Sequence, residues 1–137
     1  MKKIITIAIA ALLSVLAFVI AGRMPGSDGV IARRTLPDGT NILVTQKHVS
    51  GGYEVGLYFR EPDAEWGWCY LDHDDSSWFR GRIDYDPKSD VVTVWRGRTI
   101  RAIWDRKNKQ YTRPNVQGWK STAPQDYRPP PFSDGSA

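Results

Sequence analysis

The sequence is poor in cysteine, because Cys69 is the only one among its 137 residues. A single cysteine excludes an internal disulfide, so the folded part has to be stabilised by its hydrophobic core. The aromatic neighbours Trp68 and Tyr70 indicate that Cys69 is itself a buried and unreactive thiol.

The common catalytic and cofactor-binding patterns are also missing. The chain has no histidine pair at zinc-binding spacing, no glycine-rich phosphate loop and no nucleophile elbow. A cysteine–histidine pair needs direct contact, and Cys69 and His73 would lie roughly 13 Å apart on an extended strand. The sequence therefore gives no specific sign of an enzyme, and we nominate no catalytic residue, no cofactor and no metal ion.

The folded part has little excess charge. The formal net charge of the chain is +4, from 19 basic and 15 acidic residues. Lys2, Lys3 and Arg23 flank an N-terminal hydrophobic segment, and without them the chain has 16 basic and 15 acidic residues, a net of +1. A nucleic-acid-binding domain concentrates positive charge in its folded part, so we do not expect nucleic acid as a partner.

The chain does contain one long hydrophobic run, at residues 4–22. It carries no charge, Lys2 and Lys3 precede it, and Arg23 follows it. A helix of this length would reach roughly 28 Å, which is close to the hydrocarbon thickness of a bilayer. We expect a single membrane-spanning helix whose basic start stays in the cytoplasm, which makes the remaining chain extracytoplasmic.

The same segment also resembles a secretory signal peptide. It has a basic start, and small side chains at Val19 and Ala21 precede a suitable cleavage point. Cleavage near Ala21 would give a secreted or periplasmic protein instead of an anchored one. In either case residues 1–23 are expected to lie outside the folded domain.

A short linker at residues 24–29 precedes one predicted domain at residues 30–119. Short β-type runs alternate there with turn residues, and no segment keeps a helical period. Residues 53–60 place large apolar side chains at every second position, which is typical of a strand with one buried face. Seven or eight such strands predict an all-β antiparallel meander, arranged as a barrel or a sandwich. Residues 120–137 are rich in proline, and we expect them to form a disordered tail.

Trp66, Trp68 and Tyr70 are the main candidates for ligand binding. On a strand they would share one face, where their rings could stack on the apolar faces of sugars. The alternative, which we favour, is that these rings fill the core of a domain without disulfides. Solvent-exposed rings would support a ligand-binding face, and buried rings would support a core.

The run Asp72-His73-Asp74-Asp75 suggests either a polar hairpin turn or an acid–base site. It lacks the ligand spacing and the sharp glycine turn of a calcium loop, and we interpret it as a turn. His73 is our fourth candidate for ligand binding. An alternative function, as a small exported hydrolase or enzyme inhibitor, would use residues 72–75.

These observations predict a non-catalytic, membrane-anchored or exported module that binds a ligand or has a structural role on the envelope side. Its expected partners are the membrane, through residues 4–22, and an envelope protein or a glycan.

Overall fold

The computed structural model describes residues 28–74 and 81–132. The predicted membrane segment at residues 4–22 lies outside these ranges. In the described part, no helix is long and apolar enough to cross a membrane.

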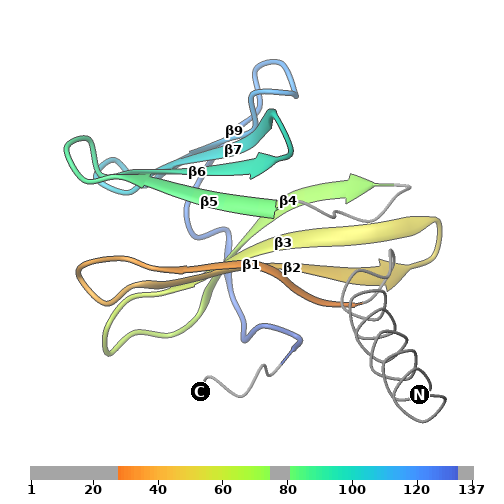
Figure 1. Ribbon diagram of the computed structural model, residues 1–137, viewed down its shortest axis with the longest axis horizontal. Coiled ribbons are helices and arrows are strands. Elements are labelled where there is room, and N and C mark those ends of the chain that lie inside the picture. The colour runs from red at the N-terminus through yellow and green to blue at the C-terminus, as the bar shows by residue number, and fades with distance from the viewer. Residues whose placement is uncertain (1–27, 75–80, 133–137) are drawn as a thin grey trace, which may run out of the picture.

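The described residues form two five-stranded antiparallel sheets, which confirms the all-β prediction (Figure 1). The first sheet has the order β1-β2-β3-β4-β10 and the second the order β5-β6-β7-β8-β9. Apart from β10, each sheet is a meander in which consecutive strands pair. The strands of the first sheet are β1 (Gly29–Thr35), β2 (Asn41–Val49), β3 (Gly52–Arg60), β4 (Gly67–Asp74) and β10 (Asp126–Tyr127). Those of the second are β5 (Gly81–Asp86), β6 (Val91–Arg96), β7 (Thr99–Asp105), β8 (Gln110–Thr112) and β9 (Lys120–Thr122).

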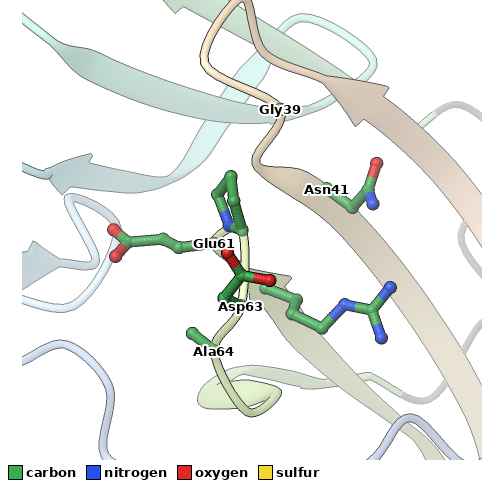
Figure 2. A pocket seen from close by; sticks show the side chains of 7 residues that line it. Gly39, Asn41, Glu61, Asp63 and Ala64 are labelled. Carbon is green, nitrogen blue, oxygen red and sulfur yellow. The ribbon is translucent and has the colours of Figure 1, made fainter.

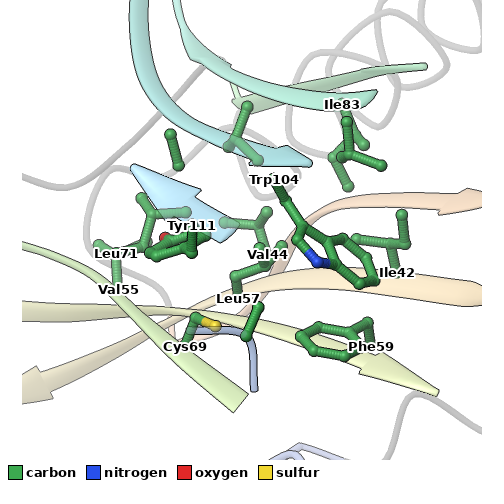
Figure 3. Close-up of a cluster of buried hydrophobic side chains, with 14 of the residues drawn as sticks. Ile42, Val44, Val55, Leu57, Phe59, Cys69, Leu71, Ile83, Trp104 and Tyr111 are labelled. Carbon is green, nitrogen blue, oxygen red and sulfur yellow. The ribbon is translucent and has the colours of Figure 1, made fainter. Parts of the chain in front are cut away.

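The hydrophobic core lies between the two sheets (Figure 3). Val55, Leu57 and Phe59 of β3 all belong to it, as the alternation in residues 53–60 predicts. At the edge of the first sheet that lies opposite β10, strand β1 contacts β5 of the second sheet. There Arg34 Nη1 donates a hydrogen bond to the carbonyl of Ile83 at 3.0 Å. Cys69 is a fully buried free thiol, as predicted, and burial raises its pKa to about 12.

A β-bulge in β4 changes which side chains reach the interior. Gly56 pairs with Tyr70, but the preceding residue Val55 pairs with Asp72, so β4 has one extra residue at this point. Both Leu71 and Asp72 are buried as a result. The bulge therefore places a carboxylate inside, where strict alternation would have turned it outward.

The C-terminal segment differs from the expected disordered tail, since residues 120–122 form β9 and residues 126–127 form β10. Backbone hydrogen bonds attach it to the edge of β4: the Gln125 amide donates to the Trp68 carbonyl at 2.9 Å, and the Arg128 amide donates to the Trp66 carbonyl at 3.0 Å. Pairing with an open strand edge orders this segment despite its proline content, which composition alone does not reveal. Residues 133–137 lie outside the described part.

Candidate functional site

The aromatic side chains of β4 point away from the core. Cys69 and Leu71 belong to the core cluster, whereas Trp66, Trp68 and Tyr70 alternate with them and are half-buried. The interpretation that these three rings fill the core is therefore wrong, because β4 presents its smaller side chains to the interior. The rings do share one side of the strand.

An arginine side chain lies over each of these rings. The guanidinium carbon is 5.0 Å from the ring centroid for Arg60 on Trp66, and 3.8 Å for Arg128 on Trp68. Arg113 lies 4.9 Å from the centroid of Tyr70. A ligand that stacks on these rings would first have to displace an arginine, at a cost of about 0.5–1 kcal/mol or more for each.

The three arginines differ in their other partners. Arg128 forms an ion pair with Asp126 at 2.7 Å, and Arg113 lies 3.5 Å from Asp72. Among residues 28–74 and 81–132, no carboxylate forms an ion pair with Arg60. Arg60, on Trp66, is therefore the arginine of this row that remains available to a ligand.

Arg60 also lines an open pocket of about 530 Å³ (Figure 2). This volume is in the range of small-molecule sites. The pocket lies between the β1–β2 loop and the β3–β4 loop, which meet at one end of the first sheet. Its lining residues are Gly39, Asn41, Arg60, Glu61, Pro62, Asp63 and Ala64. Arg60 connects this polar pocket to the ring of Trp66.

Local turn chemistry brings the two loops together. The Asp38 carboxylate accepts a hydrogen bond from the Thr40 amide at 2.9 Å, which closes the β1–β2 turn. Gly39 has φ of +89°, and a Cβ placed there would lie 3.3 Å from Cγ of Pro62. Glycine therefore permits both the turn conformation and the close approach of the other loop. Asp63 has φ of +59°, a left-handed conformation that aspartate tolerates better than most residues.

Arg106 holds this end of the molecule together. Its guanidinium lies 2.6 Å from Asp38, 3.0 Å from Asp90 and 3.6 Å from Glu61. These carboxylates come from the β1–β2, β5–β6 and β3–β4 connections, so one side chain of the second sheet links loops of both sheets. The hydrogen bond from Arg106 lowers the pKa of Asp38 to about 2.

We expect the pKa of Asp38 to return towards 3.8 in the Arg106→Met variant. A carboxylate with a lowered pKa stabilises the fold above its unfolded-state pKa, and this contribution disappears as the pH falls through the folded-state value. The Asp38 contribution should thus be complete above about pH 4 and be lost towards pH 2. Carboxyl carbon chemical shifts followed by NMR from pH 6 to pH 1.5 measure this titration.

Asp126 provides an internal control in the same titration. Its pKa is also lowered, by the hydrogen bond from Arg128. Arg106→Met should leave the titration of Asp126 unchanged. A wild-type Asp38 that titrates near 3.8 would contradict the role of Arg106.

The polar run does not form the expected turn, because residues 72–74 belong to β4, and Asp75 lies outside the described residues. These residues lie at the end of β4 away from the pocket. Asp72 is 6% exposed and pairs with Arg101 and Arg113, so its carboxylate is neutralised inside the protein. His73 is exposed, and its amide donates to the Asp72 carboxylate at 2.9 Å. Seven residues of strand place His73 about 23 Å from Trp66. In the described ranges, no three metal-binding side chains gather in one place.

The four residues nominated from the sequence thus do not form one site. Trp66 lies under Arg60, which lines the pocket, Trp68 and Tyr70 lie under paired arginines, and His73 lies at the opposite end of β4. Sequence reasoning missed Asn41, Arg60 and Asp63. The topology could have found them. In a meander, the first and third connections, here β1–β2 and β3–β4, lie at the same end of the sheet, and both contain strong turn residues.

Comparisons of the chain with protein-family models, with curated proteins and with solved structures found no match.

Proposed function

We propose that this protein is a non-catalytic binding module on the outer side of a membrane. Residues 4–22 anchor it, or direct its export if cleavage occurs near Ala21. Its ligand surface is the end of the domain that contains the pocket and Trp66. The observation that carries this proposal is the open polar pocket, whose wall includes a guanidinium stacked on an aromatic ring.

The topology favours a pocket that faces away from the membrane. The proposed anchor ends near Arg23 and β1 begins at Gly29, a connection that spans at most about 20 Å. The pocket loops lie at the other end of β1 and β2, and the nine residues of β2 extend about 30 Å. A ligand would therefore reach the pocket from the envelope or the medium.

The side chains at the pocket suit a polar envelope ligand, either a glycan or an exposed segment of an envelope protein. Asn41 offers an amide, Asp63 and Glu61 offer carboxylates, and Arg60 offers a planar set of N–H donors. Trp66 lies under the Arg60 guanidinium and supports it from behind. Of these groups, Glu61 also contacts Arg106, with 3.6 Å between Glu61 Oε1 and Arg106 Nη2.

The proposal is tested by NMR on the ¹⁵N-labelled full-length protein in phosphatidylglycerol nanodiscs. Oligosaccharides and peptides from envelope material are added in turn. Binding should shift the amide signals of Gly39, Asn41 and Ala64 and the indole signal of Trp66. Trp66→Ala should reduce the affinity at least about tenfold, which corresponds to 1.4 kcal/mol.

Trp95→Ala is the matched control, because Trp95 lies under Arg82 at 4.9 Å on the second sheet. This variant removes a comparable tryptophan–arginine contact away from the pocket and should bind normally. If no fraction shifts the pocket signals, or if the shifts gather around Trp95, the proposed function is wrong.

A further inference from the structure

The charges around the pocket fall into two groups. Glu61 contributes to the Arg106 network, with 3.6 Å between Glu61 Oε1 and Arg106 Nη2. Arg60 and Asp63 form no ion pair with any residue in the described ranges. The pocket therefore presents one guanidinium and one carboxylate that are both available to a ligand.

The Arg60 side chain and the Asp63 backbone are each restrained. The Arg60 guanidinium carbon lies over the Trp66 ring, 5.0 Å from its centroid, and this contact restrains a side chain whose N–H donors suit a carboxylate or phosphate. The backbone of Asp63 is set by a tight turn, in which the Ala64 amide donates to the Glu61 carbonyl at 3.2 Å. Figure 2 shows the Glu61 side chain directed away from that of Asn41, with Asp63 between them.

We propose that the pocket recognises a zwitterion, whose anionic group binds Arg60 and whose ammonium group binds Asp63. This inference rests on the proposed function and specifies its ligand. A purely anionic ligand would be repelled by Asp63 and a purely cationic one by Arg60, whereas a zwitterion is attracted to both. Asn41 Oδ1 accepts a hydrogen bond from the Thr35 hydroxyl at 2.8 Å, and the Asn41 amide nitrogen can donate to the anionic group.

Two sources carry this chemistry: an amino acid or short peptide with free ends, and the headgroup of a zwitterionic lipid. The test uses the full-length protein in phosphatidylglycerol nanodiscs, which contain no zwitterionic headgroup. Alanyl-alanine, its N-acetyl form, its C-terminal amide, phosphorylethanolamine and a neutral disaccharide are titrated separately by NMR. Alanyl-alanine or phosphorylethanolamine should bind at least about tenfold more tightly than either blocked dipeptide, a difference of 1.4 kcal/mol. The tighter of the two identifies the source.

Three variants test which charge of the pocket binds which charge of the ligand. Arg60→Gln should abolish the preference for a free carboxylate and keep the preference for a free ammonium group, and Asp63→Asn should do the reverse. Lys88→Gln, in the β5–β6 turn, is the charge control and should retain both preferences. Unchanged melting temperatures show that each variant is folded.

The outcomes separate this inference from the function on which it rests. If the neutral disaccharide shifts the pocket signals as strongly as the zwitterions, and Arg60→Gln and Asp63→Asn have no effect, the zwitterion inference is overturned and the binding function remains. If no probe and no envelope fraction shifts the pocket signals, both are wrong.

Discussion

The Trp104→Ala variant should lose about 3–5 kcal/mol of unfolding free energy. Trp104 is 3% exposed on β7, and its ring centroid lies 4.0 Å from that of Phe59 on β3. Figure 3 shows the two rings between the sheets, together with Ile42. Truncation would leave a cavity at a contact that joins both layers, and a domain with one core rarely has more than about 5–15 kcal/mol in total.

Chemical denaturation followed by far-ultraviolet circular dichroism measures this loss. Trp95→Ala serves again as the control, since Trp95 is half-buried outside the core and lies under Arg82. We expect it to lose less than half as much stability. Equal losses in the two variants would show that Trp104 does not hold the sheets together.

Asp72→Ala should also destabilise the protein by about 3–5 kcal/mol. The substitution removes the carboxylate that pairs with Arg101 and Arg113, whose side chains are only 18% and 10% exposed. Two positive charges would then remain in a poorly hydrated region without this counter-charge. The loss of stability comes mainly from the two arginine charges that stay buried without their counter-charge, and less from the lost ion-pair contact itself.

Two further variants test this explanation. Asp84→Ala removes the partner of Arg82, but that pair is exposed, at 58% and 46%, so we expect a loss of less than about 1 kcal/mol. The triple variant Asp72→Leu/Arg101→Met/Arg113→Met removes all three charges and should regain most of the stability lost in Asp72→Ala. A triple variant as unstable as Asp72→Ala would mean that the buried charge is not the cause.

Much of the fold could be predicted because a strand with one buried face has a period of two. Val55, Leu57 and Phe59 show this period, and the structure places all three in the core. The turn at Pro37-Asp38-Gly39 was equally clear from local chemistry. Such features depend on neighbours in the chain and need no knowledge of distant partners.

The candidate site was less predictable. Alternation correctly put Trp66, Trp68 and Tyr70 on one side of β4, but it could not say which side faces the second sheet. The packing of the two sheets decides this, since it places Cys69 and Leu71 in the core and leaves the three rings on the other side of the strand. The bulge at Asp72 could not be predicted from the sequence either, because it depends on how β4 pairs with β3.

The sequence by itself determined that this chain is an antiparallel all-β protein with a buried thiol and no disulfide, because alternation and turn propensities act over a few residues. Only the tertiary structure decided that the C-terminal segment completes the first sheet, that Arg106 joins three connections, and that Arg60 and Asp63 share a pocket. These features depend on side chains and strand edges that meet after the two sheets have packed, so no local pattern in the sequence encodes them visibly.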